Sequence, residues 1–262
     1  MPELMIEERG CLPTVDLGGV LVATLSRPPA NAMNRAAVEA IANLFRGLAD
    51  TDNPPPVVIT GEGQRFFSAG GDIKELGGAP VDQLATRMRL FHDMLVAMDR
   101  YPRPVVAAVN GYCVGGGLEF AMFADAVLAV PHAQFGFPEI RHGLLPAEKG
   151  IKRVTRLIGT RAARDLLLTG DLVGTRRAVE IGLVDEVVEP AALLDAAISR
   201  ASRDGDKAPI LYAALKRALN DFDDADDDRR FGTTLDNAAT YFDDPVAKTL
   251  RDGWRGRPDA GD

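Results

Sequence analysis

Hydrophobic and polar positions follow two alternating patterns along the first 190 residues. Short apolar runs at 20–28, 54–63 and 104–111 are bounded by proline or glycine, which is typical of strands. Residues 36–50 and 82–98 carry apolar side chains at helical spacing, which predicts helices. Strands that alternate with helices in this way predict an α/β fold.

The pattern changes near residue 190. Before it, residues 115–125 predict the start of a helix, and 126–130 and 184–188 predict strands. Further helices are predicted at 149–159, 160–170 and 175–184. Beyond Pro190 the spacing is helical to the end of the chain. We therefore expect a core over 1–190 and a mostly helical part over 191–262.

Composition and charge narrow the class of protein. With 262 residues, 46% hydrophobic and 26% charged, the chain suits one large soluble globular domain, or one domain with a small appendage. Its apolar runs are too short to cross a membrane, and its first residues lack the pattern of a signal peptide. A net charge of −8 argues against broad nucleic-acid binding. Cys11 and Cys113 lack metal-ligand spacing, which indicates a reducing, cytoplasmic location.

Several common site motifs are incomplete in this chain. Residues 111–120, GYCVGGGLEF, supply the first two glycines of a dinucleotide-binding turn, but the third position holds Phe120. The sequence contains no phosphate-binding loop and no serine-nucleophile elbow. His92, His132 and His142 are isolated and have no metal-ligand spacing. Nicotinamide chemistry and serine hydrolysis are therefore disfavoured.

The aspartate-rich segment 220–230 is better explained as a solvated helix junction than as a metal site. A calcium loop needs glycine at its sixth position and glutamate at its twelfth. Counted from Asp221, these positions hold Asp226 and Gly232. We therefore predict no metal site here.

Two glycine-rich segments follow predicted strands. One is 66–76, FFSAGGDIKEL, and the other is 111–120. Glycine lets backbone N–H groups approach a ligand, so two such segments can aim two donors at one oxygen. Gly116 also lies at a predicted helix start, where free N–H groups favour negative charge. The alternative is that both segments are only turns.

Two glutamates occur in apolar surroundings. Glu119 lies on a predicted helix with no polar face before Asp125. A buried carboxyl without a partner tends toward a raised pKa, which suits proton transfer near neutral pH. Glu139, within FGFPEIRHG, is the second acid. The alternatives are a helix-dipole role for Glu119, and an ion pair with Arg141 or a turn position for Glu139.

Together these segments resemble the enoyl-CoA hydratase/isomerase (crotonase) superfamily over nearly the whole chain. The matching segments are RPPANAMN (27–34), FFSAGGDIKEL (66–76), VNGYCVGGGLEFAMFAD (109–125), AQFGFPEIRHGLLP (133–146) and LTGDLVGTRRAVEIGLVDEVV (168–188). The combination is highly specific, although each segment alone is weak. The resemblance implies an α/β crotonase (ClpP/crotonase-like) spiral of strand-strand-helix turns with a helical C-terminal trimerisation part.

The resemblance also implies roles for individual residues. Gly71 and Gly116 match the two oxyanion donors, and Glu119 and Glu139 match the two catalytic glutamates. The residues implied to contact coenzyme A are Ala30, Ala32, Met33, Ala69, Asp72, Ile73 and Lys74. No metal is implied, and no cofactor besides the coenzyme A that belongs to the substrate.

Because both acids are present, the resemblance implies hydration of the 2,3-double bond of a 2-enoyl-CoA thioester to the 3-hydroxyacyl-CoA. The alternatives on the same scaffold are an enoyl-CoA isomerase, an acyl-CoA thioester hydrolase and a catalytically silent acyl-CoA binder. The implied partner is the acyl-CoA thioester, with no nucleic acid and no membrane. The chain is expected to form a homotrimer or homohexamer through its C-terminal part.

One departure from the family pattern concerns PAEKG (146–150), where many family hydratases have small, glycine-rich residues. Glu148 and Lys149 either fill part of the acyl pocket or face solvent at a helix start. The tail RDGWRGRP (251–258) is only loosely similar to that of the family.

Overall fold

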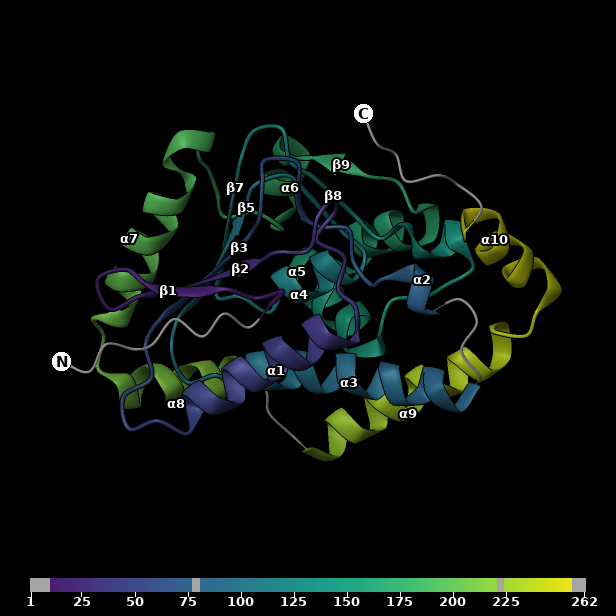
Figure 1. Ribbon diagram of the computed structural model, residues 1–262, viewed down its shortest axis with the longest axis horizontal. Helices are drawn as coiled ribbons and strands as arrows, with labels where there is room; N and C mark the ends of the chain where they lie inside the picture. Colours follow the sequence, from purple (N-terminus) through teal and green to yellow (C-terminus); the bar gives the residue numbers. More distant parts are fainter. Residues whose placement is uncertain (1–9, 77–80, 221–223, 256–262) are drawn as a thin grey trace.

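The computed structural model describes residues 10–76, 81–220 and 224–255 (Figure 1). The N-terminal residues used to judge a signal peptide lie outside these ranges, as do Asp221 and the end of the tail. Within the described ranges, strands and helices alternate up to β10, and helices follow from there. The predicted α/β class and the helical C-terminal part are confirmed.

A six-stranded sheet forms the centre of the fold. Its order is β1-β2-β3-β5-β7-β10, in which β1 is antiparallel to β2 and the other pairs are parallel. The strands are β1 (Thr14–Asp16), β2 (Leu21–Leu25), β3 (Val57–Gly61), β5 (Val105–Val109), β7 (Ala126–Ala129) and β10 (Glu186–Val187). All five residues of β5 are buried, which explains why its run is apolar throughout rather than alternating.

A second sheet of short strands lies beside the first. Its order is β4-β6-β8-β9, with β8 and β9 antiparallel. The strands are β4 (Phe66–Ser68), β6 (Tyr112–Val114), β8 (Gln134–Gly136) and β9 (Val173–Gly174). The sequence did not predict them, because two or three residues are too few to show a period of two. Successive turns of the chain place one strand in each sheet, β3 then β4, β5 then β6, and β7 then β8, which produces the spiral.

The helices of the core cover the sheets and close the site. They are α1 (Arg35–Ala49), α2 (Ile73–Leu76), α3 (Val81–Asp99), α4 (Gly116–Ala121), the 3-10 helix η1 (Pro138–His142), α5 (Glu148–Thr169) and α6 (Thr175–Ile181). Asn34 begins α1, since its side chain accepts a hydrogen bond from the N–H of Ala37. The predicted break between two helices near 159 is confirmed within α5, where Gly159 has a φ of 75°.

In the described residues beyond β10, the C-terminal part consists of four helices and one 3-10 turn. They are η2 (Pro190–Ala192), α7 (Leu193–Gly205), α8 (Pro209–Asn220), α9 (Asp224–Tyr241) and α10 (Pro245–Arg255). α7 packs against β3, β5 and β7 of the large sheet, whereas α9 packs against α3 and α5 and α10 packs against η1. Figure 1 shows α9 running beside α3 along one side of the molecule. The C-terminal helices therefore reach both the sheet and η1, the segment that carries Glu139.

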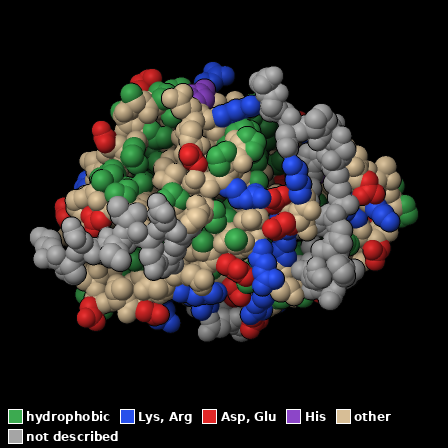
Figure 2. Space-filling view, viewed as in Figure 1, with side chains coloured by type: hydrophobic (Ala, Val, Ile, Leu, Met, Phe, Trp, Pro, Cys, Tyr) green, Lys and Arg blue, Asp and Glu red, His purple; other side chains and the backbone are tan. Residues whose placement is uncertain are grey.

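Charged side chains of both signs gather near the start of α1 and α2 on the face shown in Figure 2. Charges of opposite sign lie together in this region because several of them form ion pairs. These pairs include Arg27–Asp72 at 2.6 Å and Arg87–Glu75 at 3.1 Å. Among the described residues, no helix has the length and apolar character needed to span a membrane.

Candidate active site

A cavity of about 150 Å³ lies where the two glycine-rich segments meet α3, η1 and α9. Its wall is mainly apolar, and among the described residues Glu119 and Glu139 are its two acidic groups. The lining residues include Met33, Ala69, Gly71, Met88, Phe91, Gly115, Gly116, Glu119, Glu139, His142, Leu144, Leu145, Ala147, Thr234 and Tyr241. The structure thus brings all four predicted catalytic residues to one cavity.

The first oxyanion candidate, Gly71, is oriented by pairing with the segment around Met33. The N–H of Met33 donates to the carbonyl of Gly70 at 2.7 Å, and the N–H of Asp72 donates to the carbonyl of Met33 at 2.9 Å. Successive N–H groups of an extended chain point in opposite directions, so the N–H of Gly71 points away from Met33. This orientation leaves the Gly71 donor available to the cavity that the residue lines.

The three glycines of the second segment have separate geometric roles. Gly115, at a φ of 55°, leaves room for Glu139, since a methyl group there would lie 2.6 Å from Oε1. Gly116 opens α4, where its N–H has no acceptor within the helix. Gly117 packs on the backbone of Ser68, and a methyl group would lie 2.6 Å from that carbonyl oxygen. A methyl group on Gly116 would lie 3.4 Å from the nitrogen of Gly71, so the two candidate donors are close together.

Glu119 is held within the first turn of α4 and is 3% exposed. Its Oε2 accepts a hydrogen bond from the N–H of Ala147 at 3.1 Å. Burial raises the pKa of Glu119 well above its ordinary value of 4.5, and the nearby charge of Glu139 adds to the rise. The hydrogen bond from Ala147 lowers the same pKa but does not offset the burial.

Glu139 lies in η1, and its carboxyl group packs directly against Gly115. The residue as a whole is half-buried, but its Oε2 is fully buried and has no hydrogen-bond partner among the described residues. Burial raises the pKa of Glu139 from 4.5 to about 7. The charge of Glu139 therefore makes the ionisation of Glu119 depend on that of Glu139.

We expect the raised pKa of Glu139 to make stability depend on pH. Between its ordinary value of 4.5 and its folded value of about 7, the folded chain binds more protons than the unfolded chain, so stability falls as pH rises through this window. Glu139→Gln cannot ionise and should be more stable than the parent at about pH 8, by about 3 kcal/mol. The advantage should disappear at about pH 4, below both pKa values. Thermal unfolding at both pH values tests this, and an equal difference at both would contradict it.

Few of the residues expected to contact coenzyme A lie on the cavity itself. Met33 and Ala69 line it. The N–H of Ala69 donates to the carbonyl of Ala30 at 2.9 Å, so the two predicted coenzyme A segments lie side by side. Asp72 forms an ion pair with Arg27, and Lys74 is exposed on α2. Ala32 belongs to the Met33 loop, where its carbonyl accepts from Arg27 at 2.8 Å, and the side chain of Ile73 lies outside the described part.

Both expectations for Lys149 are wrong. Lys149 neither lines the cavity nor faces solvent, because its side chain is 4% exposed and its Nζ lies 2.7 Å from Asp227 and 3.0 Å from Asp99. Glu148 is also absent from the cavity wall, and its carboxylate lies 3.4 Å from the Nζ of Lys152. The cavity therefore meets PAEKG at Ala147 rather than at its two long side chains.

Several residues that contact Glu119 or line the cavity were not predicted from the sequence. Gly150 contacts Glu119 so closely that a methyl group there would lie 2.7 Å from Cδ and overlap the carboxylate. A glycine inside a predicted helix is costly and could have been recognised as a packing requirement. Thr234 and Tyr241 of α9 complete the wall, and no local pattern links them to residues about 100 positions earlier.

The three histidines do not form a metal site. His142 lines the cavity, His92 is buried beside Phe231, and His132 lies 3.4 Å from the carbonyl of Gln64. Over the described ranges, no group of three or more His, Cys, Asp or Glu side chains is arranged to hold a metal ion.

Comparison with known proteins agrees with the fold. The model of the enoyl-CoA hydratase/isomerase family matches residues 17–251. A probable enoyl-CoA hydratase, EchA17 of Mycobacterium tuberculosis, is 34% identical over 203 residues, which are 78% of this chain and 77% of that protein. The 2,3-dehydroadipyl-CoA hydratase of Escherichia coli is 35% identical over 201 residues, which are 76% and 78% of the two chains. The solved structure of EchA1_1 from Mycobacterium paratuberculosis is 31% identical with a TM-score of 0.80, and covers 95% of this chain and 97% of that one.

The two-sheet spiral with a helical C-terminal part is thus the crotonase fold, as the sequence predicted. The chain belongs to the enoyl-CoA hydratase/isomerase family.

Proposed function

We propose that this protein hydrates the 2,3-double bond of a 2-enoyl-CoA thioester to give the 3-hydroxyacyl-CoA. The observation that carries the proposal is the pair of buried acids on one cavity, Glu119 with Oε2 held by Ala147 and Glu139 with an unpartnered Oε2. Two carboxyls with raised pKa values suit a reaction that removes one proton and delivers another near neutral pH.

In the proposed mechanism, the thioester carbonyl accepts hydrogen bonds from the N–H groups of Gly71 and Gly116. These donors polarise the conjugated double bond and stabilise the enolate-like transition state that forms as oxygen adds to C3. The proximity of the two nitrogens and the orientation of Gly71 support this arrangement. The mainly apolar wall lowers the local dielectric constant, which strengthens both hydrogen bonds.

The two acids would hold one water molecule and divide the proton transfers. One carboxylate takes a proton from the water as its oxygen bonds to C3, and the other carboxyl delivers or relays a proton to C2. The sum adds one water across the double bond, so no redox or metal step is needed. Burial and mutual repulsion keep the pair from ionising twice near neutral pH, which supplies one base and one acid together.

Turnover of a panel of 2-enoyl-CoA thioesters tests the proposal. Loss of the conjugated absorbance with formation of the 3-hydroxyacyl thioester is expected. Double-bond migration in a 3-enoyl thioester without hydration would instead indicate an isomerase, and release of free thiol would indicate a hydrolase. Binding of the thioester with no reaction of any kind would indicate a silent binder.

We also propose that residues 191–262 mediate assembly into a homotrimer or homohexamer. α8 supports this, since it exposes an apolar stripe in which Leu211, Leu215 and Leu219 are 63%, 66% and 74% exposed. Large exposed apolar side chains at helical spacing are typical of a surface that a second chain covers. Leu215→Glu combined with Leu219→Glu should therefore reduce the mass of the assembly measured by light scattering. A parent chain that stays monomeric at micromolar concentration would contradict the proposal.

A further inference from the structure

Lys149 is the centre of a buried cluster of charges that joins three helices. Its Nζ lies 2.7 Å from Oδ1 of Asp227 on α9 and 3.0 Å from Oδ2 of Asp99 on α3. The side chains of Lys149 and Asp99 are 4% and 5% exposed. Arg100 approaches Asp227 from α3's end at 3.1 Å, and Lys149 also lies 5.5 Å from the ring centre of Phe123. Such a cluster fixes the relative positions of the elements that supply its members.

The first turn of α5, which carries Lys149, also holds Glu119. The N–H of Ala147, two residues before Lys149, donates to Oε2 of Glu119. Gly150, one residue after it, packs directly against the same carboxylate. Lys149 therefore lies between the two backbone contacts that determine where the carboxylate of Glu119 lies.

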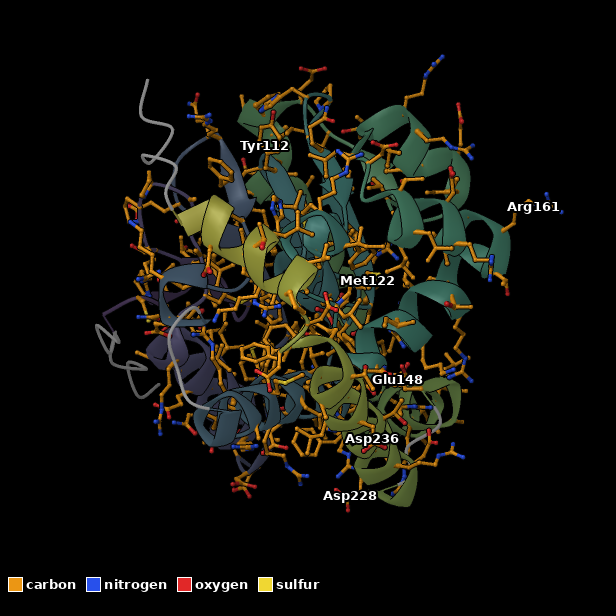
Figure 3. All side chains as sticks on the ribbon, turned by 90° about the vertical axis from the view of Figure 1, so that its right-hand side faces the viewer. Tyr112, Met122, Glu148, Arg161, Asp228 and Asp236 are labelled. Carbon is orange, nitrogen blue, oxygen red and sulfur yellow. The ribbon has the colours of Figure 1, made fainter. Side chains whose placement is uncertain are left out.

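α9 contacts this turn at a second point. The N–H of Glu148 donates to Oγ1 of Thr234 at 3.0 Å, and Thr234 lines the cavity. Figure 3 shows Glu148 at the start of α5 beside α9, the helix that carries Asp228 and Asp236. Asp227 and Thr234 are seven residues apart on α9, which is about two helical turns. The ion pair and the hydrogen bond therefore hold the α5 turn at two separate points along that helix.

We propose that Lys149 and Asp227 are positioning residues for Glu119: the buried ion pair between α5 and α9 holds the backbone of residues 147–150 where it can orient the Glu119 carboxylate. The inference rests on the proposed function for its effect on turnover. The positioning of Glu119 can be tested without turnover, because it concerns the hydrogen bond from the N–H of Ala147 to the Glu119 carboxylate. The alternative is that the ion pair only stabilises the packing of α9. The experiment must distinguish this role from the positioning of Glu119.

The same chain offers a matched control. Lys216 on α8 is 5% exposed, and its Nζ lies 2.7 Å from Oδ2 of Asp125. Neither residue lines the cavity. Lys216→Met therefore removes a lysine that is as deeply buried as Lys149 and has an aspartate at the same distance, but that makes no hydrogen bond or ion pair with residues 147–150. Comparison of Lys149→Met with Lys216→Met separates loss of a buried ion pair from loss of Glu119 positioning.

The first measurement is the titration of Glu119 itself. Carboxyl carbon NMR of protein labelled at glutamate, assigned with Glu119→Gln, follows its ionisation without any need for turnover. The hydrogen bond from Ala147 lowers the pKa of Glu119, so Lys149→Met and Asp227→Asn should raise this pKa further, whereas Lys216→Met should leave it at the parent value. Asp227→Asn is nearly isosteric and leaves Lys149 paired with Asp99, so it serves if Lys149→Met does not fold.

The second measurement is turnover of a short 2-enoyl-CoA thioester. Lys149→Met and Asp227→Asn should lower kcat at least about tenfold with KM nearly unchanged, because the carboxylate is misplaced and the thioester contacts remain. Lys216→Met should keep the parent kcat. Unchanged Glu119 titration in both test variants, or the same loss of kcat in Lys216→Met, would overturn the inference. A parent protein that hydrates no thioester would refute the proposed function, while the titration would still decide the role of the ion pair.

Discussion

Glu119→Gln and Glu139→Gln should each lower the rate of hydration by about 10²–10⁴ while binding of the CoA thioester is largely retained. Each change replaces a carboxyl with an amide of nearly the same shape that cannot transfer a proton. Since the thioester handle and the two glycine donors are untouched, the loss should appear in kcat more than in KM. Steady-state kinetics with a crotonyl-like substrate and calorimetric titration with a saturated acyl-CoA measure the two quantities.

The double substitution adds a test of whether the acids act together. Groups that share one proton-transfer step give losses that are far from additive, so the double variant should be little slower than the slower single variant. Glu148→Gln is the matched control, because Glu148 belongs to the adjacent segment but does not line the cavity. Parent-level hydration in both single variants would refute the assignment of these two acids.

Gly150→Ala should lower kcat by about 10² with little loss of stability. The methyl group would overlap the carboxylate of Glu119 and lie 2.7 Å from its Cδ. Because the three nearest atoms all belong to that one flexible side chain, the carboxylate can move away without disturbing the backbone. The substitution should therefore displace the Glu119 carboxylate, and a displacement of about 1 Å can lower the rate by about 10².

A second glycine provides the control for this substitution. Gly47, on the exposed face of α1, has no atom within 4 Å of the position a methyl group would take. Gly47→Ala should raise the unfolding temperature slightly, since alanine favours a helix, and should leave kcat at the parent value. If Gly150→Ala turns over substrate at the parent rate, Glu119 does not need the position that it occupies in the structure.

The local sequence was sufficient for the elements that are long enough to show a period. The runs that became β2, β3, β5 and β7 were predicted, as were α1 and α3, because each is long enough to show strand or helix character together with its flanking residues. The types of the candidate site residues were also readable, since a glutamate among apolar residues and glycines after strands are local signals. The resemblance to the family then related those segments to one another.

Tertiary structure alone decided how these residues contact one another. Hydrogen bonds to strands distant in the sequence define the second sheet, whose strands of two or three residues have no pattern of their own. The environment of the Lys149 side chain is set by Asp99 and Asp227, which are 50 and 78 residues away along the chain. Whether a charged side chain at a helix start faces solvent, a pocket or a buried counter-charge is set by the elements packed against it. The sequence by itself therefore determined which groups are present and on which element each lies, and the packing of α3, α5 and α9 determined which of them meet.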